Sequence, residues 1–267
     1  MGTNIASHDA WSSGDSYERH VGRWSRLVAQ EFIHWLAIPE ASEWLDVGCG
    51  TGALSQTILK LTNPEKLKGI DRSEDYVKSA RSKVNYPNVE FDTGDAQSLP
   101  VESEIVDVAV SGLVLNFVSQ PNQMISEMKR AVKLNGIVAV YVWDYAAKMQ
   151  FMRHFWNAAA ALDSAAINLD EGRRFPICNP DSLLDLFRAA GLKDISTRPI
   201  DIPTDFKDFD DYWTPFLGGQ GPAAGYAMSL SEERRTQLRD RIYNSLPFAL
   251  DGSIPLVARA WAIKGIK

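Results

Sequence analysis

Short apolar runs alternate with amphipathic segments along the first half of the chain, and turn residues separate them. Buried strands are predicted at about 43–47, 67–71, 89–91, 105–111 and 137–143, where aliphatic residues follow one another closely. Between them, apolar residues recur every three or four positions in segments that begin after Gly52, Ser73 and Pro121. Strands that alternate with helices predict right-handed crossovers and a doubly wound, mostly parallel sheet of an α/β protein.

Capping residues mark the ends of the predicted helices. Ser73, Asn179 and Ser231 each stand where a helix N-cap is expected, and the last of these helices should run to about residue 246. Asn135-Gly136 is expected to end the helix that starts at Pro121, because this pair favours a left-handed backbone.

The regular alternation is interrupted twice after the fifth strand. Residues 144–178 and 203–230 are rich in aromatic side chains, and the second stretch is also rich in glycine. A sixth strand is predicted between them at 194–201, and a last strand at 254–263. The aromatic stretches either pack as a second layer or line a pocket for an apolar ligand. We favour the pocket, because long loops in a compact domain are usually functional or disordered.

The glycine-rich stretch after the first strand is the strongest candidate for ligand binding. Gly48, Gly50 and Gly52 alternate with small residues between a predicted strand and a predicted helix. Glycine lets the backbone approach a ligand closely, and a helix N-terminus offers free N–H groups. The spacing is one residue shorter than the dinucleotide pattern. Asp46 precedes the first glycine, and its carboxylate would repel a phosphate and attract a cationic ligand.

Further polar residues fall at the carboxyl ends of the predicted parallel strands, where such sheets bind ligands. Asp71 lies 23 residues after Gly48, and a carboxylate there can accept hydrogen bonds from ribose hydroxyls. Asp95 and Ala96 follow the third strand, where the acid could meet an adenine amine. Ser111 ends the fourth strand.

These stretches, taken in order, resemble the class I S-adenosylmethionine-dependent methyltransferases over about residues 40–145. The resemblance implies a Rossmann-like methyltransferase fold with a seven-stranded sheet, whose last strand is antiparallel and inserts beside the sixth. It implies S-adenosylmethionine as the cofactor. The competing interpretation is a nicotinamide enzyme, and the glycine spacing, Asp46 and Gly94-Asp95-Ala96 weigh against it. The predicted cofactor-binding residues are Tyr17, Arg23, Trp24, Asp46, Gly48, Cys49, Gly50, Gly52, Asp71, Arg72, Asp95, Ala96 and Ser111.

An N-terminal segment, residues 1–38, precedes the predicted methyltransferase domain at 39–267, which has insertions at about 144–178 and 203–230. Within this segment, residues 17–36 have the periodicity of an amphipathic helix. The helix either packs on the core or caps the cofactor, as N-terminal segments of related enzymes often do. In the second case Tyr17 and Trp24 lie near the methionine end, and Arg23 pairs with the methionine carboxylate.

Methyl transfer is an in-line displacement that requires alignment and exclusion of water, and a general base only if the acceptor keeps its proton. Asp144 and Tyr145 follow the fifth strand and are catalytic candidates, unless they form a structural turn. His154 is a third candidate, and its alternative is simple packing. We expect no metal site. Asp208, Asp210 and Asp211 form a small acidic cluster that is expected to be solvated.

Charge and composition narrow the class of acceptor. The net charge is −6 and the isoelectric point about 5.3, which disfavours binding to a nucleic acid duplex. The Asn/Asp-Pro-Pro-Tyr/Phe motif of base methyltransferases is absent, and Ser111-Gly112-Leu113 stands in its place. We therefore expect methyl transfer to a small molecule in a lidded pocket. The alternative is a sensor that binds S-adenosylmethionine or its product without transfer.

Two cysteines do not make a disulfide framework, and neither a leader nor an apolar run of ~20 residues is evident. The expected location is the cytoplasm, without a membrane partner. The oligomeric state stays open.

Overall fold

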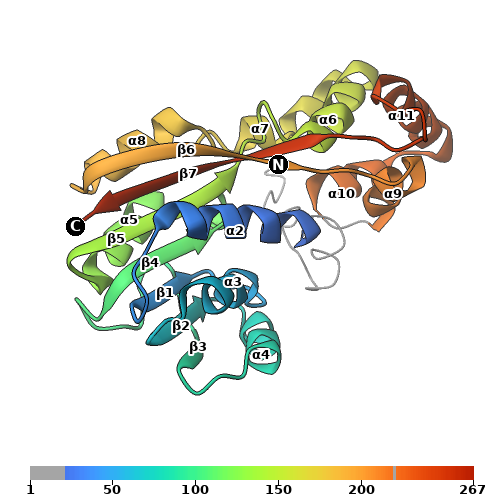
Figure 1. The fold of residues 1–267 in the computed structure, drawn as a ribbon. Coiled ribbons are helices and arrows are strands. Elements are labelled where there is room, and N and C mark those ends of the chain that lie inside the picture. Colours follow the sequence, from blue (N-terminus) through green and yellow to red (C-terminus); the bar gives the residue numbers. More distant parts are fainter. Residues whose placement is uncertain (1–21, 219–220) are drawn as a thin grey trace. The chain divides into compact units, whose positions relative to one another are not determined.

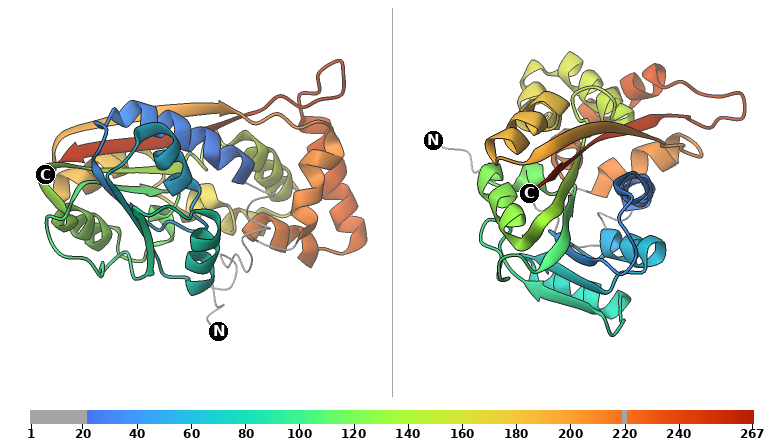
Figure 2. Two further views of the ribbon diagram at one scale, coloured as in Figure 1. Left: turned by 60° about the horizontal axis from the view of Figure 1, so that its bottom comes forward. Right: turned by 60° about the vertical axis from the view of Figure 1, so that its left-hand side comes forward.

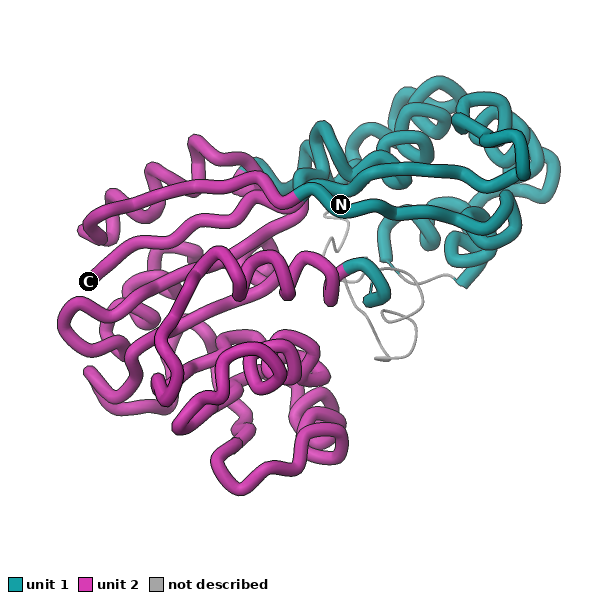
Figure 3. The backbone as a smooth tube through the Cα atoms, viewed as in Figure 1, with its two compact units in different colours: residues 1–24, 144–176, 201–259 teal, residues 25–143, 177–200, 260–267 magenta. Residues whose placement is uncertain are grey.

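A computed structural model describes residues 22–218 and 221–267, and the chain forms two compact units (Figures 1 and 3). Unit 1 comprises residues 1–24, 144–176 and 201–259, and unit 2 comprises residues 25–143, 177–200 and 260–267. Unit 1 therefore combines both predicted aromatic insertions with the start of the N-terminal helix. It also includes residues 231–259, which were not part of the predicted insertions.

One sheet of seven strands has the order β3-β2-β1-β4-β5-β7-β6. Strands β1 to β5 pair in parallel, whereas β7 lies between β5 and β6 and is antiparallel to β5. The sequence-based prediction of a seven-stranded, mostly parallel sheet is thus confirmed. The strands are β1 (Glu43–Val47), β2 (Lys66–Asp71), β3 (Val89–Thr93), β4 (Val106–Gly112), β5 (Val132–Trp143), β6 (Lys193–Pro203) and β7 (Val257–Ile266).

Helices cover both faces of the sheet in unit 2. Helices α2 and α3 lie on one face, and α5 and α8 pack side by side on the other (Figures 1 and 2). The apolar side of α2 packs against the sheet, where the rings of Phe32 and Tyr141 are 4.8 Å apart. The helices here are α2 (Arg23–Leu36), α3 (Ala53–Thr62), α4 (Glu74–Lys83), the 3₁₀ turn η3 (Leu115–Phe117), α5 (Pro121–Ala131) and α8 (Pro180–Ala189).

The predicted caps of α4 and α8 are present, but the predicted end of α5 is wrong. Ser73 and Asn179 accept hydrogen bonds from backbone N–H groups of the helices that follow them. Helix α5, however, ends at Ala131, and β5 begins at once. Asn135 does have a left-handed backbone, with φ +63°, but it lies in an irregular part of β5 between Val132 and Ile137. An Asn-Gly pair indicates a left-handed backbone. This conformation occurs at irregularities within strands as well as at the ends of helices.

Unit 1 is mainly helical, and both predicted insertions contain helices. Helix α6 places Phe151 and Phe155 four residues apart on its buried side. Most aromatic rings of the insertions pack on one another; Phe155 and Phe216, for example, stack at 4.5 Å. These rings therefore form the core of unit 1, as the packing interpretation predicts. The elements are α6 (Gln150–Leu162), η4 (Ser164–Asn168), α7 (Glu171–Arg174), α9 (Phe209–Trp213), η5 (Thr214–Gly218), α10 (Pro222–Ser229) and α11 (Glu232–Ser245).

None of the helices in the described parts of the chain combines the length and the apolar character needed to cross a bilayer.

Candidate functional site

The glycine turn after β1 has a backbone that only glycine adopts without strain. Gly48, Gly50 and Gly52 have φ angles of +75°, +53° and +87°. A Cβ atom on Gly48 would lie 2.5 Å from the side chain of Val114, so this glycine is needed for packing. A Cβ atom on Gly50 would meet no described atom within 4 Å. Gly50 therefore faces open space, which a ligand can enter.

Asp71, at the end of β2, joins the glycine turn to the start of α4. Its Oδ2 accepts a hydrogen bond of 2.9 Å from the backbone N–H of Gly50, and its Oδ1 accepts one of 2.9 Å from Ser73. A carboxylate offers about four acceptor positions, so each oxygen retains capacity for a further donor. The partly buried carboxylate is thus fixed in orientation and still able to bind hydroxyl groups.

Asp46 precedes the glycine turn, and its carboxyl group is buried. Its carboxyl group is 1% exposed, and Oδ2 accepts a hydrogen bond of 2.6 Å from the Ser55 hydroxyl. Its Oδ1 has no hydrogen-bond partner among the residues that the structure describes. The pKa of Asp46 is raised from its ordinary value of 3.8 to about 7, chiefly by burial; the hydrogen bond from Ser55 lowers it, and the negative charge of nearby Asp71 adds to the rise.

Two predicted cofactor residues at the same sheet edge direct their side chains into the protein. The Cys49 thiol is buried in an apolar cluster with Phe91 and Val77, and burial raises its pKa. The Ser111 hydroxyl donates a hydrogen bond of 2.7 Å to the carbonyl oxygen of Val47. Ser111 therefore links β4 to β1. Contact with a cofactor remains a prediction for Cys49 and Ser111, and it would involve their backbone atoms.

Asp95 lies on an exposed loop after β3. Its Oδ1 accepts a hydrogen bond of 2.8 Å from the backbone N–H of Gln97, which lowers the pKa of Asp95. The Gln97 side-chain oxygen in turn accepts hydrogen bonds of 2.9 Å from Ser119 and from the backbone N–H of Gln120. Gln97 thus anchors the Asp95 loop to the start of α5, a role that no sequence motif indicated. Ala96 is half-buried, and Arg72 is exposed.

The structure describes two of the three N-terminal residues that are predicted to bind the cofactor. Tyr17 lies outside the described residues. The Arg23 guanidinium is paired with Asp211 of α9, with Nη1 at 3.1 and 3.2 Å from the two carboxylate oxygens. Arg23 also stacks on the Trp24 ring at 4.3 Å. The predicted contact of Arg23 with a methionine carboxylate would compete with this ion pair, and it remains a prediction.

Each of the three catalytic candidates has a structural partner within unit 1. Asp144 is buried, and its Oδ1 accepts a hydrogen bond of 3.0 Å from the backbone N–H of Ala147, which closes a turn. The Tyr145 ring contacts Phe175 at 5.7 Å. His154 Nδ1 lies 3.0 Å from the Ser245 hydroxyl, and burial lowers the pKa of this histidine. Their catalytic roles remain predictions.

The acidic cluster at 208–211 has structural partners. Asp208 caps α9 by accepting a hydrogen bond of 2.9 Å from the backbone N–H of Asp211, and Asp211 pairs with Arg23. Within residues 22–218 and 221–267, no group of three or more His, Cys, Asp or Glu side chains is arranged to hold a metal ion.

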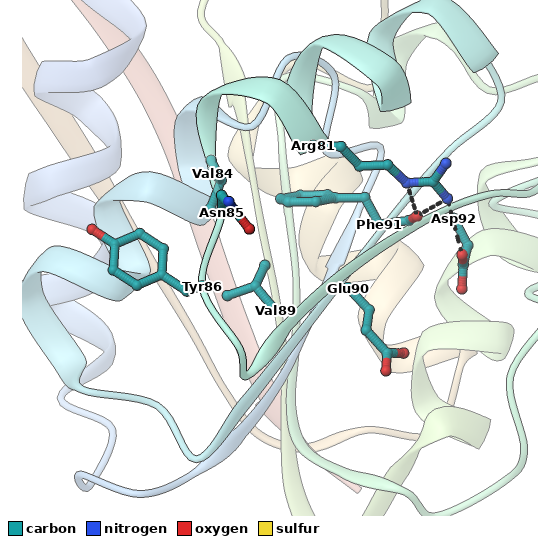
Figure 4. Close-up of a pocket in the computed structure, with 8 residues that line it drawn as sticks. All are labelled: Arg81, Val84, Asn85, Tyr86, Val89, Glu90, Phe91 and Asp92. Carbon is teal, nitrogen blue, oxygen red and sulfur yellow. Dashed lines mark hydrogen bonds and ion pairs between the residues drawn. The ribbon is translucent and has the colours of Figure 1, made fainter.

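A surface cavity of about 300 Å³ lies between α4 and β3 (Figure 4). Arg81 points across it toward β3, and its Nε donates a hydrogen bond of 2.9 Å to the carbonyl oxygen of Phe91. The cavity is lined by the end of α4, the turn at Asn85-Tyr86 and the first residues of β3. Its lining includes neither the glycine turn nor Asp71, so it is distinct from the candidate cofactor site.

Comparison with known proteins assigns the family. A family model described as a methyltransferase domain matches residues 39–191, more than half of the chain. The demethylmenaquinone methyltransferase of Geobacillus stearothermophilus is 26% identical over 213 residues, which are 73% of this chain and 88% of that protein. A 37.1 kDa protein of transposon TN4556 from Streptomyces fradiae is 37% identical over 104 residues, and the match covers 38% of this chain and only 30% of that protein.

A solved structure shares the fold. Phosphoethanolamine N-methyltransferase 2 of Haemonchus contortus, in complex with phosphomonomethylethanolamine and S-adenosylhomocysteine, superposes with a TM-score of 0.60 at 14% identity. The match covers 95% of this chain and 56% of that one. The open space at Gly50, the free acceptor capacity of Asp71 and the buried acid Asp46 fit a ligand with ribose hydroxyls and a cationic end. The chain belongs to the class I S-adenosylmethionine-dependent methyltransferases.

Proposed function

We propose that this methyltransferase acts on a small organic molecule with a planar, apolar body. The observation that carries the proposal is the match to the demethylmenaquinone methyltransferase, which spans most of both chains. The name of that relative denotes a quinone acceptor. The acidic net charge of this chain supports the same class of acceptor, because phosphate-rich partners are bound by clustered Lys and Arg.

Asp71 and the glycine turn are the proposed anchors of the cofactor, and S-adenosylmethionine supplies the activated methyl group when bound. Asp71 accepts hydrogen bonds from the ribose hydroxyls, and Gly50 allows the backbone to approach the ligand. Asp46, when ionised, contributes a negative charge near the cationic end of the ligand. Asp95, held by Gln97, is the proposed partner of the adenine amine.

The protein's part in the transfer step is to align the acceptor and exclude water. A general base is required only for an acceptor that keeps its proton. Asp144, Tyr145 and His154 are the proposed candidates for that role. The aromatic insertions of unit 1 are the proposed determinants of the acceptor, because aromatic side chains offer a large apolar area to a planar molecule.

The test is a transfer assay with purified protein, S-adenosylmethionine and separate acceptors. Mass spectrometry should detect S-adenosylhomocysteine and a methylated product with 2-hydroxy-1,4-naphthoquinone, and neither product with duplex DNA or tRNA. The Asp71→Ala variant serves as the negative control. Methylation of nucleic acid would contradict the proposal. Tight binding of S-adenosylhomocysteine without transfer to any acceptor would favour the sensor.

A further inference from the structure

Four buried hydrogen-bond donors of unit 1 lack an acceptor among the described residues. One is Nε of Arg153, and the other three are Nε1 of Trp24, Nε of Arg23 and the hydroxyl of Thr204. Trp24 is 8% exposed and Thr204 is fully buried. Buried polar groups are nearly always paired in folded proteins, because an unpaired donor costs stability. The donors at Trp24, Arg23 and Thr204 therefore call for an explanation.

Phe206 contacts two of the residues that carry these donors. Its ring centroid lies 5.7 Å from that of Trp24, and the Arg23 guanidinium carbon lies 4.9 Å from it. The backbone N–H groups of Thr204 and Phe206 donate hydrogen bonds to the facing extended segment, at Leu256 and Ile254. Side chains two residues apart on an extended segment lie on the same face. The Thr204 side chain and the Phe206 ring therefore lie on the same face of this segment, and Arg23 and Trp24 contact that ring.

The donor types define the missing partner. An indole and a guanidinium only donate hydrogen bonds, so the partner must supply an acceptor atom. The charge of Arg23 is already balanced by Asp211, at 3.1 Å, which argues against a multiply charged anion. The surrounding rings favour a planar, apolar body. The Arg23 and Asp211 side chains are 37% and 32% exposed, so the outer end of this cluster is open to solvent.

We propose that Trp24, Thr204 and Arg23 bind a carbonyl oxygen of the methyl acceptor. This inference rests on the proposed function and specifies its substrate class: a planar apolar molecule that carries a carbonyl group. Such a site rejects an analogue without the oxygen, because its own buried donors are then left unpaired. The cluster is therefore a specificity site of the reaction.

The first test follows the indole N–H signal of Trp24 in a ¹⁵N-labelled protein, assigned by comparison with Trp24→Phe. The protein is titrated with 1-acetonaphthone and, in parallel, with naphthalene, which has the same rings and no oxygen. The proposal predicts a shift of the Trp24 signal with 1-acetonaphthone and roughly tenfold weaker binding of naphthalene. No shift with either probe, or equal binding of both, overturns it.

The second test uses Thr204→Val, which keeps the shape of the side chain and removes the hydroxyl. The variant should bind 1-acetonaphthone several-fold more weakly, while its melting temperature stays equal or rises because an unpaired buried hydroxyl is gone. The control is Thr236→Val on the exposed helix α11. This substitution removes a hydroxyl that donates a hydrogen bond to the carbonyl oxygen of Glu232. A Thr204→Val variant that binds the probe like the wild type overturns the role of Thr204.

S-Adenosylhomocysteine separates this inference from its alternatives. The sequence-based prediction places Trp24 and Arg23 at the methionine end of the cofactor. A shift of the Trp24 signal with S-adenosylhomocysteine, and none with 1-acetonaphthone, overturns the acceptor site. A different outcome is a shift of the Trp24 signal with 1-acetonaphthone while the transfer assay detects no methylated product. That result supports the carbonyl site and contradicts only the proposed function.

Discussion

The Asp71 carboxylate accepts a hydrogen bond of 2.9 Å from the backbone N–H of Gly50, and so joins the end of β2 to the glycine turn after β1. The two residues are 21 positions apart in sequence and lie at the carboxyl ends of two adjacent parallel strands, Asp71 as the last residue of β2 and Gly50 in the turn after β1. This bond orients both parts of the candidate cofactor site at once. Its removal is therefore expected to affect both ligand binding and the local backbone.

Asp71→Ala should weaken S-adenosylhomocysteine binding by more than tenfold. The variant loses charge-assisted hydrogen bonds to the ribose, each worth about 1.5–3 kcal/mol. Isothermal titration calorimetry measures the change. Asp75→Ala, which removes an exposed acid from the first turn of α4, is the matched control and should bind like the wild type. An unchanged affinity in Asp71→Ala would exclude this residue as the ribose ligand.

Gly48→Ala and Gly50→Ala should separate packing from ligand binding. Both substitutions strain a backbone with positive φ, at roughly 1–2 kcal/mol. Only Gly48→Ala also drives a Cβ atom against Val114, so it should lower the melting temperature further. Gly50→Ala places its methyl group in open space and should mainly weaken S-adenosylhomocysteine binding. Equal melting temperatures, or full affinity in Gly50→Ala, would contradict this division of roles.

The buried acid Asp46 should make stability depend on pH. Its pKa is raised from 3.8 to about 7 on folding, so the folded state retains this proton at pH values where the unfolded state has lost it. The free energy of unfolding should then fall as pH rises from about 4 to about 7, by at most roughly 4 kcal/mol from this group. Urea denaturation of wild type and Asp46→Asn across this range measures the effect. Parallel curves would show that Asp46 titrates normally.

Divalent cations should not bind at the acidic cluster of α9. Asp208 caps the helix and Asp211 is paired with Arg23, so neither carboxylate is free to join a set of metal ligands. Calorimetric titration with magnesium or calcium chloride should show no saturable binding, and EDTA should leave methyl transfer intact. A site that disappears in Asp208→Asn would show that the cluster was misinterpreted.

Residues 203–230 are predicted to respond to the cofactor as part of a lid. A methyl donor must be shielded from water during transfer and released afterwards, which requires a mobile cover. Hydrogen exchange with and without S-adenosylhomocysteine should reveal added protection in 203–230 as well as at the glycine turn. Helix α5, at Pro121–Ala131, serves as an internal reference whose exchange should stay constant. Protection confined to residues 44–96 would contradict the lid.

The sequence by itself determined the seven-stranded sheet and placed the acids that are predicted to bind the cofactor at the ends of its strands. Parallel strands are buried on both faces and read as continuous apolar runs, and the glycine spacing reflects backbone angles that are local. The same locality explains the error at Asn135-Gly136, since a left-handed backbone serves a strand irregularity as well as a helix end.

Only the tertiary structure decided what partners the polar side chains take. The pairing of Arg23 with Asp211 joins residues 188 positions apart, and the bond between Asp71 and Gly50 depends on strand order. The burial of Asp46, and of the donors at Trp24 and Thr204 that have no acceptor within the described parts of the chain, likewise arises from packing between distant segments. Periodicity records which face of an element is apolar. Hydrogen-bond partners and pKa values depend on contacts and burial that exist only once the chain has folded.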